Sequence, residues 1–207
     1  RNMLKPADTI FFRSNWEPNF HCSHARRIGK IGDGGKWACD VHRLKQHSDC
    51  IIYSAGSYGD FSFEIAMKNI TPHCEIHTFD KNFHSCPKDV CTFHQISLGN
   101  GSEPNGSQSW SQIIQRLNHF NRSIEIFKID IDGGEFSFMP LIFNSQKTSF
   151  PRQILVEIHQ NNAKTVNTFF ELLRFNNYVI FNKEANLVGC HQFFEYALLR
   201  LNTLFFK

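Results

Sequence analysis

Short apolar runs alternate with segments of helical spacing from residue 50 onward, and this order limits the fold more than any other feature of the sequence. Seven runs are predicted to be strands, at residues 50–56, 75–80, 91–97, 124–132, 153–159, 178–184 and 193–201. Helices are predicted at residues 61–69, 110–120, 136–143 and 162–177. Strands that alternate with helices in this way form a parallel sheet with helices packed on its faces.

The two final strands have no helix between them, only a loop that contains Gly189. Strands joined in this way pair antiparallel or lie apart in the sheet. We therefore predict an α/β fold whose seven-stranded sheet is mostly parallel and ends in an antiparallel strand pair. A chain of 207 residues suits one such domain, over residues 50–207. Residues 1–49 show no clear periodicity and are predicted to form an N-terminal extension or lid.

Charge and hydropathy argue against two classes of protein. A net charge of +3 is too small to indicate a nucleic-acid-binding protein. No apolar run approaches the roughly 20 residues that a membrane-spanning helix needs. Because the sequence begins at Arg1 without an initiator Met, it reads as a fragment or a processed product, and membrane contact is expected only through an anchor that would precede it.

The first predicted strand opens into a turn that contains Gly56 and Gly59, before a predicted helix. Glycine permits a tight turn and lets a ligand approach the backbone at the start of a helix. The next strand ends in Asp80, 24 residues after Gly56, and an acid near that offset can accept hydrogen bonds from ribose hydroxyls. Each feature alone has a simpler interpretation, as a plain turn or a solvated strand end. Together they lie at the carboxyl ends of adjacent strands, where open sheets bind ligands.

The strand at 124–132 carries Lys128, Asp130 and Asp132 in alternation with isoleucines, so all three are predicted to point to one face. Charged groups on a central strand are costly unless they are paired or used in function, and a Lys128–Asp130 ion pair is one interpretation. Asp132 stands where the strand ends and a glycine turn begins, with Glu135 three residues further on.

His159 ends the next predicted strand, with Glu157 on the same face. If these two strands are neighbours, Asp132, Glu135 and His159 come close together. A histidine on a strand is usually only a hydrogen-bonded polar residue. Beside two acids at the carboxyl end of a sheet, it becomes a candidate general base.

The cysteines and the acceptor sites for N-glycosylation leave the compartment open. The cysteines number seven, so at least one is unpaired within the chain; they are Cys22, Cys39, Cys50, Cys74, Cys86, Cys91 and Cys190. The pattern Asn-x-Ser/Thr occurs four times, at Asn69, Asn100, Asn105 and Asn121. One interpretation is a cytosolic protein with reduced thiols, and another is a disulfide loop between Cys86 and Cys91. A third is a zinc site of His84, Cys86, Cys91 and His94.

Six segments together resemble one known family. They are GDGGKWACD (32–40), IIYSAGSYGDFSFE (51–64), IHTFD (76–80), KIDIDGGE (128–135), VEIH (156–159) and FNKEAN (181–186). From about residue 15 to about residue 201, the chain is similar to the methyltransferase-like animal family related to FkbM-type S-adenosylmethionine methyltransferases. KIDIDGGE resembles the signature Lys-x-Asp-x-Glu-Gly-x-Glu, with Asp132 in place of Glu. The glycine motif departs from the usual Gly-x-Gly in having Ser54 and Gly56.

The resemblance implies a Rossmann-like class I methyltransferase fold and S-adenosyl-L-methionine as the cofactor. It implies cofactor contacts from Ser54, Gly56, Ser57, Gly59, Asp80 and Asp130. A lid over the cofactor is expected from Asp33, Gly34, Gly35 and Trp37. FkbM-type relatives methylate hydroxyl oxygens, so the implied acceptor is a small molecule or glycan with a hydroxyl group. His159 would take the hydroxyl proton, with Asp132 and Glu135 orienting it or the acceptor.

The resemblance also bears on the compartment and leaves two other functions open. Many members of the family are secretory or membrane-anchored, which favours the secretory pathway (Golgi or extracellular) and a glycoprotein over the cytoplasm. Asp130-Ile131-Asp132 is an Asp-x-Asp motif of the kind that metal-dependent glycosyltransferases use. The other alternative is a degenerate module that binds the cofactor without turnover.

Overall fold

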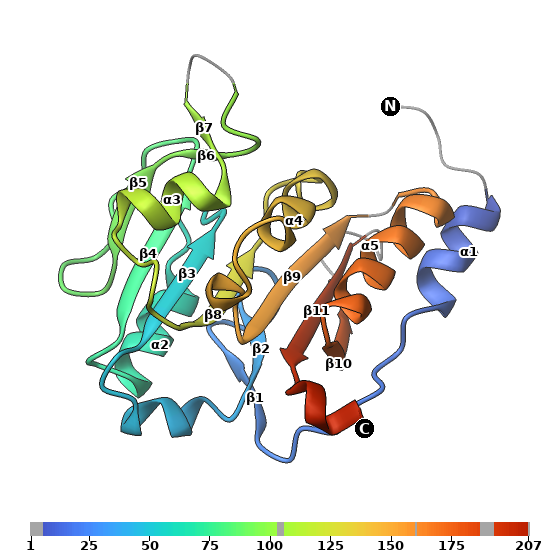
Figure 1. The fold of residues 1–207 in the computed structure, drawn as a ribbon, viewed down its shortest axis with the longest axis horizontal. Helices are drawn as coiled ribbons and strands as arrows, with labels where there is room; N and C mark the ends of the chain where they lie inside the picture. Colours follow the sequence, from blue (N-terminus) through green and yellow to red (C-terminus); the bar gives the residue numbers. More distant parts are fainter. Residues whose placement is uncertain (1–5, 103–105, 160, 187–192, 207) are drawn as a thin grey trace.

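The computed structural model of the chain describes residues 6–102, 106–159, 161–186 and 193–206, and its main sheet has seven strands in the order β10-β11-β9-β8-β3-β4-β5 (Figure 1). These strands are β3 (Ile51–Ala55), β4 (Glu75–Asp80), β5 (Thr92–Gln95), β8 (Ile124–Ile129), β9 (Gln153–His159), β10 (Tyr178–Ala185) and β11 (Phe193–Arg200). Strand β11 is antiparallel to β9 and β10, and the other neighbours are parallel. The predicted α/β fold, mostly parallel with an antiparallel C-terminal pair, is confirmed.

Helices and a hairpin cover both faces of the sheet, so the central strands β3 and β8 are buried along their whole length. One face packs against α1 (Pro6–Ser14), α3 (Trp110–Arg116), α4 (Glu135–Phe143) and α5 (Ala163–Phe175). The other face packs against α2 (Ser62–Ile70), the 3-10 helix η1 (Val41–Gln46) and an antiparallel hairpin of β1 (Ala25–Ile28) and β2 (Lys36–Cys39). The remaining elements are the short strands β6 (Ser97–Leu98) and β7 (Ser107–Gln108) and the 3-10 helices η2 (Lys147–Ser149) and η3 (Thr203–Phe206).

The N-terminal segment, predicted as an extension or lid, packs into the domain. The ring of Phe12 on α1 lies 5.1 Å from the ring of Phe194 on β11, and the β1–β2 hairpin covers one face of the sheet. Its strands have four residues each, too few to show a period in the sequence. None of the described helices is both long enough and apolar enough to cross a membrane.

Three disulfides join Cys22 to Cys39, Cys50 to Cys74, and Cys86 to Cys91. The zinc site considered for His84, Cys86, Cys91 and His94 is therefore wrong, because the two sulfur atoms are bonded to each other and cannot act as thiolate ligands. Cys190 and the loop residue Gly189 lie outside the described residues.

Candidate functional site

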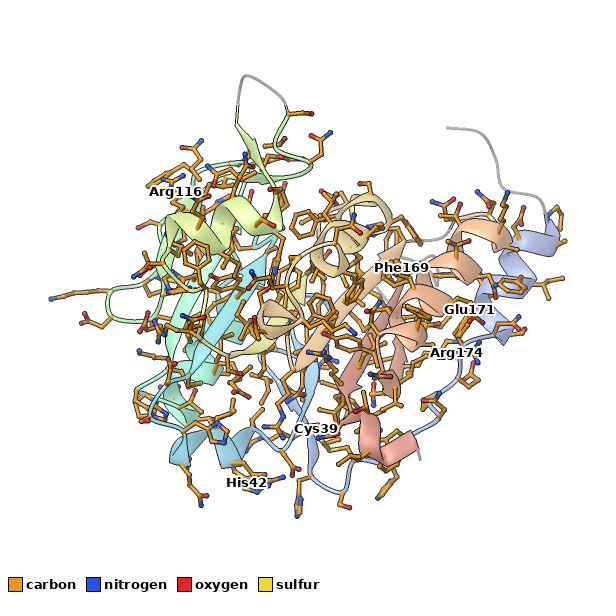
Figure 2. The ribbon with its side chains drawn as sticks, viewed as in Figure 1. Cys39, His42, Arg116, Phe169, Glu171 and Arg174 are labelled. Carbon is orange, nitrogen blue, oxygen red and sulfur yellow. A yellow bond between two sulfur atoms is a disulfide. The ribbon has the colours of Figure 1, made fainter. Side chains whose placement is uncertain are left out.

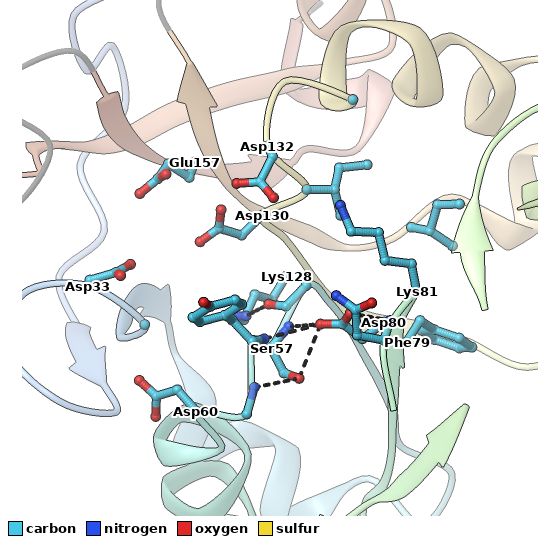
Figure 3. Close-up of a pocket in the computed structure, with 18 of the residues that line it drawn as sticks. Asp33, Ser57, Asp60, Phe79, Asp80, Lys81, Lys128, Asp130, Asp132 and Glu157 are labelled. Carbon is cyan, nitrogen blue, oxygen red and sulfur yellow. Dashed lines mark hydrogen bonds between the residues drawn. The ribbon is translucent and has the colours of Figure 1, made fainter. Parts of the chain in front are cut away.

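A cavity of about 830 Å³ opens at the carboxyl ends of β3, β4, β8 and β9 (Figure 3). This is the edge of an open parallel sheet at which ligands bind. Figure 3 shows Ser57 and Asp80 at one end of the cavity, and the carboxylates of Asp130, Asp132 and Glu157 at the other. One end of the cavity is thus formed by the turn after β3 with Asp80 beside it, and the other by three carboxylates.

Gly56 forms the turn after β3 and packs tightly against the end of β8. Its φ is 79°, and a Cβ atom here would overlap the carbonyl oxygen of Asp130. The Gly56 amide donates to the carbonyl of Phe79, at 2.9 Å, and Lys128 Nζ donates to the Gly56 carbonyl, at 2.8 Å. Only glycine fits this position, and the turn is held from both neighbouring strands.

Asp80, at the end of β4, holds the same turn through its carboxylate. Its Oδ2 accepts hydrogen bonds from the amides of Ser57 and Tyr58, at 3.0 and 3.1 Å, and its Oδ1 accepts from Asn82 N, at 2.9 Å. Burial alone would raise the pKa of Asp80, but these amide donors outweigh it and hold the pKa below its ordinary value. The carboxylate is therefore charged, and it shapes the glycine turn besides facing the cavity.

Three of the other predicted cofactor residues differ in their access to the cavity. Ser57 and Gly59 line it, as predicted. Ser54 does not, because it lies inside β3 with no exposed surface and its Oγ has no hydrogen-bond partner among the described residues. Ser54 can support the strand but cannot reach a ligand in this arrangement.

Asp130 lines the cavity and is paired with a buried lysine from the N-terminal hairpin. Lys36 Nζ on β2 donates to Asp130 Oδ2, at 3.1 Å, and to Glu195 Oε1 on β11, at 2.6 Å. Its side chain is 1% exposed. The considered Lys128–Asp130 ion pair is wrong, because Lys128 turns to the Gly56 carbonyl and Lys36 takes its place.

The single ammonium group of Lys36 lies among three carboxylates, those of Asp130, Glu157 and Glu195. Burial raises the pKa of Glu195 to about 8, with Glu157 and Asp130 adding to the effect against the attraction of Lys36. Burial and the neighbouring Asp130 likewise raise the pKa of Glu157, whose Oε2 accepts from Asn186 Nδ2, at 2.7 Å. Behind the acidic end of the cavity, the buried ammonium of Lys36 therefore lies among carboxylates whose pKa values are shifted by burial and by one another.

His159 ends β9 at this acidic end and lines the cavity. Its Nδ1 lies 3.6 Å from Glu135 Oε1, its Nε2 lies 3.6 Å from Glu157 Oε1, and its ring packs 4.5 Å from that of Phe193. Burial alone would lower the pKa of His159, but Glu135, Glu157 and Asp130 outweigh it and hold the pKa above its ordinary value. The imidazole is thus a stronger base than a free histidine.

Asp132 and Glu135 lie in different environments, although the sequence predicts both beside His159: Asp132 lines the cavity and Glu135 does not. Strand β8 ends at Ile129, so the alternation predicted to reach Asp132 stops short. Asp132 has a φ of 56° and is exposed at the cavity. Glu135 is fully buried, does not line the cavity, and accepts from the Ile131 amide, at 2.8 Å. Glu135 can therefore orient His159 but cannot touch an acceptor.

Only some of the residues predicted as a lid lie at the cavity. The loop between β1 and β2 brings Asp33 and Gly34 to the cavity, whereas Gly35 and Trp37 do not line it. Trp37 Nε1 donates to Glu184 Oε2 on β10, at 3.1 Å. Successive side chains of a strand point to opposite faces. Because Lys36 points toward the residues beneath the cavity, its neighbour Trp37 points away from the cavity.

Sequence reasoning missed Lys36 and Glu195. The sequence marks both residues as unusual. Lys36 follows the two glycines of the hairpin loop, and Glu195 is a charged residue within the apolar strand FFEYALL. A charged residue in a buried strand calls for a partner. No pattern in the sequence shows that the partner lies 159 positions away.

A glycine turn and an acid at adjacent strand ends of a parallel sheet are the arrangement of nucleotide-binding α/β proteins. The chain belongs to the methyltransferase-domain family, whose model matches residues 2–200. S-adenosyl-L-methionine is the cofactor that this family implies. The residues present fit it, since Gly56, Ser57 and Gly59 line the cavity and Asp80 is a charged acceptor beside them.

Solved structures similar to the chain include three with this cofactor or its product. An O-methyltransferase from Streptomyces achromogenes, in complex with SAM, has a TM-score of 0.48 and 15% identity, covering 78% of each chain. An O-methyltransferase from Bacillus cereus, in complex with SAH, has a TM-score of 0.47 and 10% identity, covering 96% of this chain and 93% of that one. Fibrillarin from Aeropyrum pernix, with bound S-adenosyl-L-methionine, has a TM-score of 0.47 and 9% identity, covering 89% and 86%. None of the curated proteins compared with the chain matches it.

Replacing Asp80 by alanine should weaken the binding of S-adenosylhomocysteine by about 1–3 kcal/mol, because charge-assisted hydrogen bonds are left unmade. The amides of Ser57 and Tyr58 also lose their acceptor, so the midpoint of thermal unfolding should fall. Calorimetric titration measures the first effect. Asp80→Asn, which keeps an acceptor oxygen, is the matched variant and should lose less affinity. Unchanged affinity in Asp80→Ala would mean that the ribose is held elsewhere.

Proposed function

We propose that the chain is an S-adenosylmethionine-dependent methyltransferase that methylates a hydroxyl oxygen, with a sugar or glycan hydroxyl as the acceptor. The observation that carries the proposal is the pairing of two ends in one cavity: the Gly56–Asp80 turn at one end and His159 among acids at the other. Carboxylates accept several hydrogen bonds each. The acidic end is therefore suited to an acceptor that presents many hydroxyl donors.

The cofactor end consists of Gly56, Ser57, Gly59 and Asp80. Bound there, S-adenosylmethionine supplies a methyl group on a positively charged sulfur. The glycine turn forms the wall of this end, and Asp80 would offer carboxylate oxygens to ribose hydroxyls. Asp130 joins the two ends, because its carbonyl packs on Gly56 while its carboxylate lies at the acidic end.

The acceptor end must remove one proton. Transfer of the methyl group that the cofactor would supply to a hydroxyl oxygen would leave one hydroxyl proton for this chain to accept. Glu135 faces Nδ1 of His159 from a buried position. Nε2, which lies 3.6 Å from Glu157 Oε1 at the cavity, is the nitrogen that we assign to take the proton. The carboxylates of Glu135, Glu157 and Asp130 then stabilise the imidazolium.

The finer family and the compartment are part of the same proposal. KIDIDGGE supports an FkbM-like subclass, in which hydroxyl acceptors are usual. Three disulfides support an oxidising compartment. Asn69, Asn100 and Asn121 are exposed and hence accessible to glycosylation, whereas Asn105 lies outside the described residues. We therefore place the chain in the secretory pathway, as a glycoprotein.

Incubation with methyl-labelled S-adenosylmethionine and a panel of glycans, lipids and small polyols tests the function. The protein is produced through a secretory host so that its disulfides form. We expect label on a glycan or polyol in a bond stable to mild base, as an ether is and an ester is not. Asp80→Ala should lose transfer in parallel with its cofactor affinity.

Two outcomes would overturn the proposal in different ways. Binding of the cofactor with no transfer to any acceptor would indicate a degenerate binding module. Absence of cofactor binding, together with manganese-dependent binding of a nucleotide sugar, would indicate a glycosyltransferase that uses Asp130 and Asp132.

A further inference from the structure

Two histidines and a glutamate converge at the amino end of β4, at the opposite end of that strand from Asp80 and the cavity. Glu75 Oε2 lies 3.6 Å from His77 Nε2 and 3.9 Å from His119 Nε2. One ligand atom from each of the three residues lies within 4.8 Å of the others. Both imidazoles are buried, with residue exposures of 8% for His77 and 3% for His119, while the Glu75 side chain is 50% exposed. The cluster therefore has a buried floor and an opening to solvent.

Every other polar atom of these three side chains has a partner. His77 Nδ1 contacts His94 Nε2, at 2.9 Å, and His119 Nδ1 contacts the Tyr53 hydroxyl, at 2.7 Å. His77 Nε2, although buried, makes no hydrogen bond among the described residues. With Nδ1 as the donor in both rings, each Nε2 presents a lone pair toward Glu75. Histidines that bind metals are held in this way, by a hydrogen bond from the ring nitrogen that does not bind.

The carboxylate of Glu75 is oriented by a neighbouring ion pair. Its Oε1 accepts from Arg122 Nη2, at 2.8 Å, which leaves Oε2 to face the two imidazoles. The Arg122 guanidinium also binds Asp49, with its Nε 2.6 Å from Asp49 Oδ1. Asp49 thus offsets the positive charge of Arg122, which would otherwise oppose a cation at the cluster.

We propose that Glu75, His77 and His119 bind a zinc ion. Two imidazole nitrogens and one carboxylate oxygen are ligands that zinc prefers. Ligands on one tetrahedral zinc lie about 3.3 Å apart, given bond lengths near 2.0–2.1 Å. The separations of 3.6 and 3.9 Å from Glu75 need only small side-chain movements, and the two histidine nitrogens, within 4.8 Å of each other, must move closer together. Water can take the fourth position from the exposed side. The ion would fasten β4 to the segment after α3, remote from methyl transfer.

Equilibrium dialysis of the disulfide-bonded protein against zinc alone tests the proposal, with zinc content measured per chain. We expect one zinc bound per chain and an affinity reduced at least about tenfold in Glu75→Gln. Glu75 is exposed, so this variant should fold, as thermal unfolding without metal would verify. Glu171→Gln is the matched control, because the Glu171 side chain is 43% exposed and also binds an arginine, Arg174. Glu171 lies on α5, at the far side of the molecule from Arg116 on α3 (Figure 2).

A second measurement needs no variant. Cobalt(II) added to the wild-type protein should give the intense visible absorption of a four-coordinate ion, and zinc should displace it. His119→Gln should abolish the cobalt spectrum. Zinc affinity equal in wild type and Glu75→Gln would place any bound ion elsewhere and overturn the proposal. So would the absence of zinc and cobalt binding at micromolar concentrations.

Discussion

Replacement of His159 by alanine should lower turnover at least about 100-fold, because a positioned base contributes about 10²- to 10⁴-fold to the rate. The affinity for S-adenosylhomocysteine should stay within a few-fold, since the glycine turn and Asp80 hold the cofactor at the other end of the cavity. Single-turnover transfer of labelled methyl and calorimetry measure the two quantities. His42→Ala is the control, because His42 is exposed on η1 and does not line the cavity.

The pH dependence of the same reaction separates a base from a structural histidine. The pKa of His159 is raised by its acidic neighbours, so the imidazole becomes neutral at a higher pH than that of a free histidine. The rate should rise with pH through an apparent pKa above about 6.5 and then level off. His159→Ala should lose this rise. If turnover survives nearly intact, His159 is structural and the proton goes to Asp132 or to water, because Glu135 does not reach the cavity.

Replacement of Lys36 by methionine should lower the free energy of unfolding by about 3–5 kcal/mol, the usual cost of removing one partner of a buried ion pair. Asp130, Glu157 and Glu195 would then share a buried site without a cation, and their pKa values in the folded state would lie above those of the unfolded chain. Such groups bind more protons when folded, so the variant should lose stability as pH rises above about 4–5. Urea unfolding at pH 5 and pH 8 measures the difference.

Rescue distinguishes this electrostatic cause from lost packing. The double variant Lys36→Met with Glu195→Gln removes one unpaired carboxylate without changing its size, and it should recover part of the loss, most clearly at pH 8. A Lys36→Met protein within about 1 kcal/mol of wild type at both pH values would contradict the argument. So would a double variant that is less stable than the single one.

The sequence predicted the sheet better than the site, for reasons that particular residues make clear. Each central strand is an apolar run bounded by turn residues, and that local pattern suffices to find β3, β4, β8 and β9. The glycine turn and Asp80 follow from the same pattern, because the ends of parallel strands meet at one edge.

The acidic end depends on features without a local pattern. Asp132 leaves the strand face because its backbone turns into the left-handed region. Glu135 is withdrawn from the cavity by its hydrogen bond to the Ile131 amide. Lys36 arrives on a four-residue strand of the N-terminal hairpin, and only tertiary packing brings it to Glu195. Side chains placed by long-range contacts are those that a single sequence leaves undetermined.

The contacts of the N-terminal segment also affect the order in which the chain can fold during synthesis. Asn19 N donates to the carbonyl of Ile180, at 2.9 Å, and Ile180 N donates to Asn19 Oδ1, at 2.8 Å. Lys183 Nζ binds Glu17 Oε1, at 2.6 Å. During synthesis, Glu17 and Asn19 are made well before their partners Ile180 and Lys183. Contacts between residues far apart in the sequence also form slowly. Until β10 is made, the N-terminal segment lacks these partners, so its final packing must wait until most of the chain has been synthesised.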